Sequence, residues 1–394
     1  MTRSMPRDQT FASFFQAGFE CSSHRRRDGV RLDLIRATGH DKHVLRDYRL
    51  CALHGFGTIR DGLRWHLIEK SPGRYDWSSW LPMLEAAEEA GIEVIWDLFH
   101  YGSPDCIDQA TPDFAQRFTD FAVAALEVRQ SVSGRPPLVC PLNEINFLSW
   151  AVDDGYFPRV GPRQRGWFKL QLVRTAIAAA RAIKEGGWPN STIVWAEPLI
   201  HIAPHDNRRR TIADAKTNLD GMYEAYDWIT GLARPELGGD PSLVDVVGWN
   251  FYPHNQWYYK GPTIPMGHHE YRPLADMLVE MAERYQKPLF ISETGAEGTG
   301  KPSWLHYVCN EVREAVDRGA DMKGICWYPI TAYPGWDNSR HAETGLFSTV
   351  VADGSRHVDE RLLAEFEVQR ALFAEAEAER KHSSRPRSVA AVRR

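Results

Sequence analysis

The chain has 394 residues, 43% of them hydrophobic and 25% charged, with a formal net charge of −5. This is an ordinary globular composition with enough length for a large core, and the negative charge argues against a nucleic-acid-binding protein. No apolar run is long enough to span a bilayer, and the polar segment 1–10 lacks the apolar region of a secretory signal.

Short apolar runs alternate with segments of helical spacing along most of the chain. The runs predict strands at 11–20, 58–67, 92–99, 138–140, 192–199, 243–251, 288–293 and 324–330. The spacing between and after them predicts helices at 40–53, 77–90, 112–128, 166–184, 211–232, 274–285, 303–318 and 359–379. An aromatic-rich loop is expected at 147–150, directly after the fourth strand.

Eight apolar strands, each followed by a helix, imply a parallel sheet with helices outside it. Over this length the pattern favours a single (β/α)8, or TIM, barrel spanning 1–380. No glycine-rich phosphate-binding motif follows any strand, which disfavours an open nucleotide-binding sheet. The basic, Ser-rich segment 381–394 lacks periodicity, and we expect a disordered tail there.

Two of the predicted strands end in a glutamate. Pro141-Leu142-Asn143-Glu144 follows the apolar run 138–140, and Phe290-Ile291-Ser292-Glu293 ends the seventh strand. Strand interiors avoid Asn and Glu, so carboxylates at apolar strand ends call for a reason. Glycoside cleavage supplies one, because it needs a proton donor and a nucleophile on either side of one bond.

Other polar or aromatic residues also stand at the expected strand ends. In a barrel of this kind the carboxyl ends of the strands meet at one mouth, where active sites lie. These residues are therefore candidates for one site: Glu20, His24, Arg64, His100, Asn143, Glu144, Glu197, His201, Asn250, Tyr252, Glu293 and Trp327.

With these motifs, the chain resembles the clan A glycoside hydrolases, and most closely the family 1 β-glycosidases. Asn143-Glu144 resembles the Asn-Glu pair of strand four, in which the glutamate is the acid/base. Glu293, within Ile291-Ser292-Glu293-Thr294-Gly295, resembles the strand-seven nucleophile. The resemblance implies β-glycosidase activity on a carbohydrate substrate, without a cofactor.

The resemblance also implies roles for residues on the other strands. Arg64 resembles the strand-two arginine that hydrogen-bonds the nucleophile, and His100-Tyr101 resembles the His-Trp pair that binds the sugar. Asn250-Phe251-Tyr252 resembles the strand-six element whose last tyrosine touches the nucleophile. Trp327 resembles the strand-eight tryptophan under the sugar ring.

The chain departs from family 1 in three places. The strand-one glutamine has no clear match, since Glu20, His24 and Arg25 occupy that region. Segment 331–337 replaces the strand-eight segment that reads the outer hydroxyls, and Thr294 follows Glu293 in place of asparagine. These departures leave the identity of the sugar undetermined. The type of reaction that the resemblance implies is unaffected.

A retaining mechanism places definite demands on the two carboxyl groups. Glu293 must be ionised to attack the anomeric carbon, and we expect Arg64 and Tyr252 to hold it so. Glu144 must begin protonated, and an apolar setting beside the charge of Glu293 would raise its pKa. Asn143 is placed to bind the sugar 2-hydroxyl.

Aromatic residues are candidates for stacking on the sugar. We expect Trp327 and Trp336 to contact substrate, because both lie at or after the eighth strand. Other tryptophans are expected to fill the space between the helices and the sheet: Trp77, Trp80, Trp96 and Trp188.

Two basic runs, 25–27 and 208–210, follow strands one and five on the expected mouth face. They could attract an anionic sugar, but a solvated surface is the favoured interpretation. A metal site is the rival chemistry, since His201 and His205 are four residues apart near Glu197. Pro198 and Pro204 interrupt the helix that such a pair would need, so we predict no metal.

We therefore predict a retaining β-glycoside hydrolase with Glu293 as nucleophile and Glu144 as acid/base. The alternatives are a barrel-fold transglycosylase or sugar-binding protein, or a metal-dependent sugar-converting enzyme. Six scattered cysteines without CxxC spacing are expected to be reduced thiols of a cytoplasmic protein. The sugar, the choice of exo or endo cleavage and the oligomeric state are not specified by the sequence.

Overall fold

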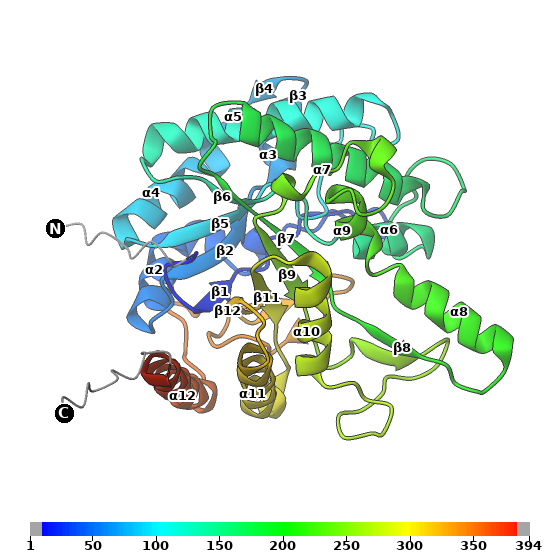
Figure 1. The fold of residues 1–394 in the computed structure, drawn as a ribbon. Helices are drawn as coiled ribbons and strands as arrows, with labels where there is room; N and C mark the ends of the chain where they lie inside the picture. The colour runs from blue at the N-terminus through cyan, green and yellow to red at the C-terminus, as the bar shows by residue number, and fades with distance from the viewer. Residues whose placement is uncertain (1–9, 384–394) are drawn as a thin grey trace, which may run out of the picture.

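A computed structural model describes residues 10–383, including the side chains up to residue 380. Eight parallel strands close into a barrel in the order β1-β12-β11-β9-β7-β6-β5-β2 (Figure 1). The strands are β1 Phe15–Gly18, β2 Thr58–Gly62, β5 Glu93–Asp97, β6 Leu138–Cys140, β7 Thr192–Pro198, β9 Val246–Asn250, β11 Leu289–Thr294 and β12 Met322–Trp327. The prediction of a single (β/α)8 barrel is confirmed.

Helices surround the barrel, and three small two-stranded sheets decorate its loops. The α-helices are α1 Leu34–Ala37, α2 His40–Leu53, α3 Trp65–Ile68, α4 Leu81–Ala90, α5 Asp113–Val132, α6 Ile145–Asp153, α7 Trp167–Glu185, α8 Arg209–Asp220, α9 Glu224–Ile229, α10 Leu274–Tyr285, α11 Lys301–Asp317 and α12 Glu360–Ser383. The 3₁₀ turns are η1 Trp77–Ser79, η2 Pro235–Leu237, η3 Pro241–Leu243 and η4 Gly298–Gly300. The small sheets pair β3 Glu69–Ser71 with β4 Arg74–Tyr75, β8 His201–Ala203 with β10 Gln256–Tyr258, and β13 Tyr333–Pro334 with β14 His341–Ala342.

The side chains of the barrel strands alternate between two cores. One buried apolar cluster fills the barrel interior, and a larger cluster lies between strands and helices. The inner cluster consists of Phe11, Ile95, Leu138, Cys140, Val194, Ala196, Val246 and Phe290. Because neighbouring residues on a strand point to opposite faces, the position of each polar residue in this alternation decides whether it can reach the mouth.

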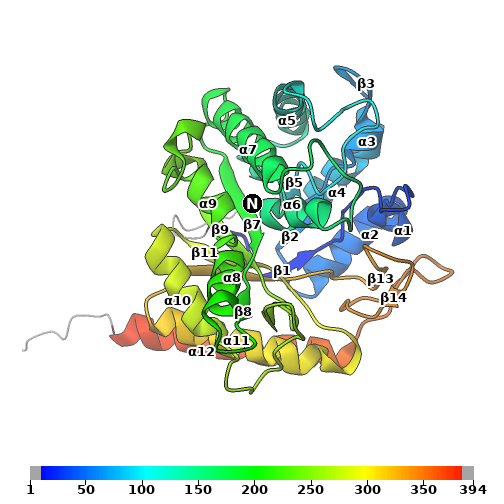
Figure 2. The same ribbon diagram turned by 90° about the vertical axis from the view of Figure 1, so that its right-hand side faces the viewer.

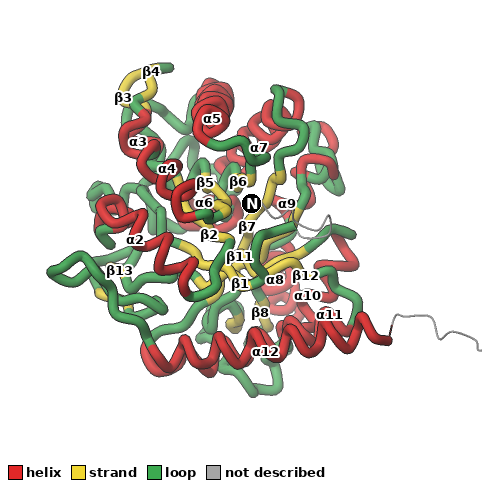
Figure 3. Tube along the Cα trace, turned by 90° about the vertical axis from the view of Figure 1, so that its left-hand side faces the viewer, coloured by secondary structure: helices red, strands yellow, loops and turns green. Residues whose placement is uncertain are grey.

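Helices far apart in the sequence cover the barrel in different ways. Figure 2 shows α8 beside β8, whereas Figure 3 shows α12 lying along one side next to α11. In the described part of the chain, no helix has both the length and the apolar character needed to cross a membrane. All six cysteines lie in that part and are free thiols.

Several local predictions differ from the structure. The helix expected at 211–232 is divided into α8 and α9, with Gly221 ending the first. The loop expected at 147–150 is part of helix α6, whose buried Ile145, Leu148 and Val152 follow helical spacing. The tail predicted at 381–394 falls outside the described residues, except that 381–383 continue α12.

Candidate active site

Glu293 lies at the carboxyl end of β11. The register of β11 on β9 shifts between Ile291 and Glu293, which marks a β-bulge. A bulge interrupts the alternation of side chains, so Ser292 and Glu293 both reach polar partners at the mouth. Ser292 Oγ donates to Asn250 Oδ1 at 2.6 Å, and Tyr252 OH donates to Glu293 Oε2 at 2.9 Å. The contact expected between Tyr252 and Glu293 is therefore present.

Arg60, in the middle of β2, is the cation of this site. Its guanidinium is fully buried and donates to Glu293 Oε1 at 2.6 Å through Nη1. Its Nε and Nη2 donate to the two oxygens of Asp97 at 3.0 and 2.7 Å, and Nη2 also donates to Asn143 Oδ1 at 2.6 Å. Arg60 of β2 thus binds side chains from three other strands or strand ends.

The prediction that Arg64 hydrogen-bonds Glu293 is wrong. Strand β2 ends at Gly62, so Arg64 lies outside the barrel as the N-cap of α3. Its Nη1 lies 3.4 and 3.6 Å from carboxylate oxygens of Asp33 and Asp41. The predicted strand at 58–67 is longer than β2, so the prediction places Arg64 within the strand, whereas the arginine within β2 is Arg60.

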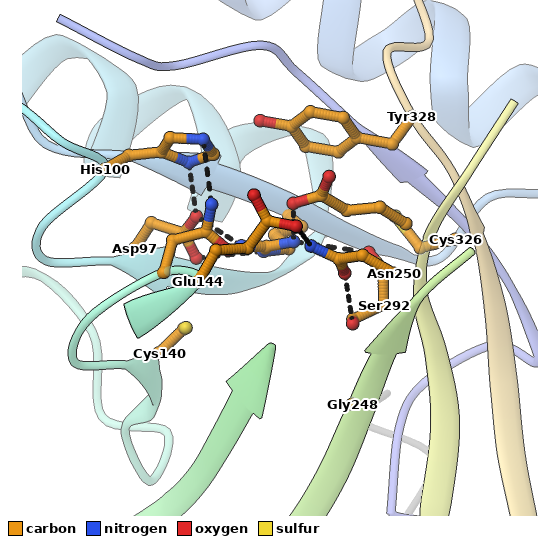
Figure 4. A network of polar contacts seen from close by, with 12 residues as sticks. Asp97, His100, Cys140, Glu144, Gly248, Asn250, Ser292, Cys326 and Tyr328 are labelled. Atoms are coloured by element: carbon orange, nitrogen blue, oxygen red, sulfur yellow. Dashed lines mark hydrogen bonds and ion pairs between the residues drawn. The ribbon is translucent and has the colours of Figure 1, made fainter. Parts of the chain in front are cut away.

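Glu144 faces the same mouth from the start of α6. Asn250 Nδ2 donates to Glu144 Oε1 at 2.8 Å (Figure 4). Tyr101 OH donates to Glu144 Oε2. Both donors are neutral groups. The backbone of Glu144 has a φ of 48°, a left-handed conformation that a residue with a side chain rarely adopts.

Asn143 and His100 link the two halves of the network. Asn143 Nδ2 lies 3.0 Å from His100 Nε2 and donates to Tyr101 OH at 3.1 Å. His100 Nδ1 lies 2.9 Å from Asp97 Oδ2. The structure therefore brings together seven of the residues singled out in the sequence: Glu20, Glu144, Glu293, His100, Asn143, Asn250 and Tyr252.

Burial has the largest influence on both glutamates and raises the pKa of each. The guanidinium of Arg60 counteracts burial and lowers the pKa of Glu293, whereas the charge of Glu144 raises it. Hydrogen bonds from Tyr101 and Asn250 lower the pKa of Glu144. Among the described residues Glu293 forms a direct ion pair with a cation and Glu144 does not, which favours the ionised form of Glu293 over that of Glu144.

The prediction that Trp327 faces the mouth is also wrong. Its ring is fully buried and packs on Phe366 of α12 at 6.0 Å, and its Nε1 donates to Thr344 O at 3.0 Å. Tyr328, one residue later, faces the mouth instead. Its ring is parallel to that of His100 at 6.2 Å (Figure 4). The same ring lies 5.4 Å from the guanidinium carbon of Arg60.

Trp336 lies at the rim, on the connection between β13 and β14. Its carbonyl oxygen lies 2.8 Å from His24 Nε2, and its ring packs on Phe147 and Phe157 at 5.4 and 6.0 Å. Its side chain is half-buried. Trp336 stays a prediction as a substrate contact.

A cavity of 1110 Å³ opens beside this rim. Its lining combines aromatic and charged groups: Arg26, Arg27, Asp28, Asp154, Gly155, Tyr156, Phe157, Asp337 and Asn338. Phe157 joins it to the network above, because its ring packs on Tyr101 at 5.8 Å.

Most of the basic groups at the rim have acidic partners. Arg25 is paired with Asp105 at 2.7 Å, and Arg26 with Asp28. In the second run Arg208 lies 3.5 Å from Asp206, and the side chain of Arg210 is 93% exposed. These contacts match the favoured interpretation of a solvated surface.

The histidines proposed for a metal do not gather. His205 Nδ1 contacts Tyr259 O at 2.9 Å, and Glu197 binds backbone amides. Over residues 10–383, the group close enough to share a metal ion is Cys21, Asp97 and His100. Both oxygens of that aspartate are bound by Arg60, which makes a cation there unfavourable.

Four residues of the network were missed in the sequence: Arg60, Asp97, Ser292 and Tyr328. Arg60 and Asp97 were detectable as charged residues inside apolar strands, which are seldom charged without a partner. The other two have no comparable signal, because Ser and Tyr occur freely at strand ends.

No known family model matches this chain, and no curated protein sequence matches it. Several solved structures, by contrast, are similar to it. A family 1 β-glucosidase from Thermotoga maritima superposes with a TM-score of 0.72 at 13% identity, over 93% of this chain and 99% of that chain. The fold is that of a family 1 β-glucosidase.

Further solved structures show the same relation. The Thermotoga maritima enzyme in complex with isofagomine lactam has a TM-score of 0.73 at 13% identity, covering 93% of this chain and 98% of its own. A hyperthermophilic β-glucosidase mutant has a TM-score of 0.68 at 15% identity, over 92% of this chain and 100% of that one. Similarity at this level establishes the shared fold, and the chemistry must be argued from the residues themselves.

Proposed function

We propose that this protein is a retaining β-glycoside hydrolase in which Glu293 is the nucleophile and Glu144 the acid/base. The observation that carries the proposal is the unequal setting of the two carboxyl groups. Glu293 is bound by the cation Arg60 and by Tyr252, whereas Glu144 is bound only by the neutral donors Asn250 and Tyr101. The first setting favours a carboxylate and the second a protonated acid.

The first step forms a glycosyl-enzyme. A Glu293 oxygen attacks the anomeric carbon as the bond to the leaving-group oxygen breaks, and Glu144 donates its proton to that oxygen. Arg60 and Tyr252 hold the Glu293 carboxylate from two sides, which aligns it for attack.

The second step returns both groups to their first state. With Glu293 esterified, its negative charge is gone and the pKa of Glu144 falls. Glu144 then removes a proton from water while the water oxygen attacks the anomeric carbon and Glu293 leaves. Two inversions at one carbon give net retention.

We assign sugar binding to the polar and aromatic groups around this pair. His100, Asn143 and Asn250 offer hydrogen-bonding groups, and Tyr328 offers an aromatic face in the place that we had expected for Trp327. Arg60 takes the part predicted for Arg64. Trp336 contributes at the rim.

We place the leaving group in the rim cavity. A general acid must lie on the side of the leaving group, and Glu144 connects through Tyr101 to Phe157, a wall of that cavity. A volume of 1110 Å³ exceeds that of most small-molecule sites, which span about 300–1,000 Å³. An acceptor sugar could enter the same space, so transglycosylation remains the related alternative.

The deciding experiment is the intact mass of the protein after incubation with activated 2-deoxy-2-fluoro glycosides of the gluco, galacto, manno and glucurono series. We expect one glycosyl unit to be added to the wild type and none to Glu293→Gln. Proton NMR of the first anomer released from a substrate of that series should show the β form. Release of the α anomer without an adduct would contradict the retaining mechanism.

A cofactor plays no part in this mechanism, and a cytoplasmic location stays a prediction from the sequence. A metal-dependent reaction would instead be abolished by a chelator. We expect turnover of a β-glycoside to continue unchanged in EDTA.

A further inference from the structure

Glu144 stands at a position where a side chain ordinarily caps the N-terminus of the helix that follows. It is the N-cap residue of α6, and the first amides of a helix have no partners within it. An N-cap side chain commonly accepts hydrogen bonds from those amides. The Glu144 side chain makes no such bond and turns instead to Tyr101 and Asn250.

Glu197 of β7 supplies the missing cap. Its Oε1 accepts a hydrogen bond from Ile145 N at 2.7 Å, and its Oε2 accepts one from Asn146 N at 3.0 Å. The side chain is buried, and it points away from the barrel interior because Val194 and Ala196 of the same strand belong to the inner core. Glu144 N also donates to Ala196 O at 2.9 Å, so two adjacent residues of β7 hold segment 144–146 at three points.

The surroundings of Glu197 couple it to the site. Burial raises its pKa to about 8, the two amide hydrogen bonds lower the pKa, and the charge of Glu144 raises it. The other titratable groups around it are Lys169 of α7, Tyr226 of α9 and Cys140 of β6. None of these makes a hydrogen bond to Glu197 in the described structure, so its two oxygens are committed to α6.

We infer that Glu197 is a positioning residue for Glu144, capping helix α6 from the neighbouring strand so that the Glu144 carboxyl is free to face the site. The inference rests on the proposed function, since it assumes that Glu144 is the acid/base. Without Glu197, two open amides would lie one and two residues after Glu144. Glu144 stands at the N-cap position, so its side chain could then accept from them, and capping its own helix would take it away from the leaving group.

The test compares aryl and alkyl β-glycosides whose leaving groups differ in pKa. A 2,4-dinitrophenyl group leaves without a proton, whereas a methyl or sugar alcohol requires one. For Glu197→Leu we expect kcat/KM to fall on the order of 100-fold with the poor leaving group, as for a slight misplacement of a catalytic group. With dinitrophenyl glycosides we expect kcat/KM to stay near the wild-type value. Glu197→Gln should lie between, because its one carboxamide oxygen can still accept one amide.

A double variant gives the sharper readout. If Glu197 acts only through Glu144, then Glu144→Ala/Glu197→Leu should show no further loss in kcat/KM relative to Glu144→Ala alone. Additive losses would contradict the inference, and so would equal losses of Glu197→Leu on good and poor leaving groups. If Glu197→Leu does not fold, Glu197→Gln combined with Glu144→Ala carries the same comparison.

Asp245, which directly precedes β9, provides a matched control because its side chain binds the start of β7. Its Oδ2 accepts a hydrogen bond from Ile193 N at 2.7 Å and one from Lys184 Nζ at 2.6 Å, at the opposite end of β7 from the site. Asp245→Asn should lower stability without any dependence on the leaving group. Active enzyme is counted by adduct formation on Glu293. A wild type that forms no adduct and cleaves no glycoside would overturn the proposed function and this inference together. An active wild type with a uniform loss in Glu197→Leu would overturn this inference alone.

Discussion

Arg60 and Asp61 are neighbours on β2, yet they belong to two different buried charge networks. Arg60 points into the barrel, where it meets Asp97 and Glu293. Asp61 points outward, where its Oδ2 accepts hydrogen bonds from Tyr48 OH at 2.7 Å and His40 Nε2 at 2.8 Å. The two networks therefore begin at neighbouring residues, but they differ in their balance of charge.

The outer network is balanced in charge. His40 lies between Asp47 and Asp61, and Arg356 binds both oxygens of Asp47 at 2.7 and 2.8 Å. Two cations thus meet two carboxylates, and Arg356 also donates to Ser348 O and Thr38 O. Every charge has an opposite partner, so the network ties α2 and the segment before α12 to the barrel.

The mouth network holds more carboxyl groups than cations. Arg60 faces Asp97 and Glu293, and His100 lies 2.9 Å from Asp97 and 3.9 Å from Glu20. Glu144 is a fourth carboxyl group close by, without an ion-pair partner among the described residues. A buried excess of carboxyl groups retains a proton and shifts pKa values, which general acid catalysis requires. The balanced charges of the outer network stabilise the fold, whereas the excess of carboxyl groups at the mouth shifts pKa values in the way that catalysis requires.

The largest effect should follow from removing the carboxylate that carries the chemistry. We expect Glu293→Gln to lower kcat by about 10⁴-fold or more, as for the loss of a nucleophile. Thermal unfolding should stay near the wild-type midpoint, because the variant relieves part of the charge excess. Turnover close to wild type would refute the assignment of Glu293.

Arg60→Met tests the cation of the mouth network. It leaves Asp97 and Glu293 without their buried partner, and we expect a loss of about 3–5 kcal/mol in the free energy of unfolding together with a large fall in kcat. Urea unfolding and steady-state kinetics measure the two effects.

Arg64→Met is the control for Arg60→Met. Because the polar partners of Arg64 among the described residues are Asp33, Asp41 and Ser79 O, kcat/KM should be unchanged. A fall in kcat for Arg64→Met as large as that for Arg60→Met would contradict the position of Arg60.

The outer network should show itself in the pH dependence of stability. Burial lowers the pKa of His40, but the charges of and hydrogen bonds to Asp61 and Asp47 outweigh burial and raise it to about 9 from an ordinary 6.5. A raised folded-state pKa stabilises the protein fully below pH 6.5, and the benefit is lost as pH rises through 9. The difference corresponds to about 3 kcal/mol.

Urea unfolding of the wild type and of His40→Gln between pH 6 and 9.5 measures this contribution. The wild type should lose stability across that interval, and His40→Gln should show a flatter profile from a lower starting value. Parallel profiles for the two proteins would mean that His40 is not the group that titrates.

The smallest effect separates the two aromatic residues at the end of β12. Trp327→Phe should cost about 1–2 kcal/mol of stability, as a reduction in a packed core, and leave KM unchanged. Tyr328→Leu should instead raise KM, because it removes the aromatic face beside His100. A change in KM for Trp327→Phe would indicate that Trp327 contacts the substrate and would contradict its assignment to the core.

Much of the architecture could be read from the order of residues. Alternating apolar strands and amphipathic helices predicted the barrel, because a strand buried on both faces needs apolar residues and a covering helix needs an apolar stripe. Glu144 and Glu293 stood out because carboxylates at the ends of such strands are costly. These features are local, since each is visible within about ten residues.

The sequence by itself therefore determined the barrel and the two carboxyl groups at its mouth. Only the tertiary structure decided that Arg60 and Tyr328, rather than Arg64 and Trp327, face them. A shift of one residue turns a strand side chain to the other face, and the exact end of a strand depends on pairing with strands distant in the sequence. The same reason applies to Glu197, which binds two amides about fifty residues earlier in the chain, brought beside it by the pairing of β6 with β7.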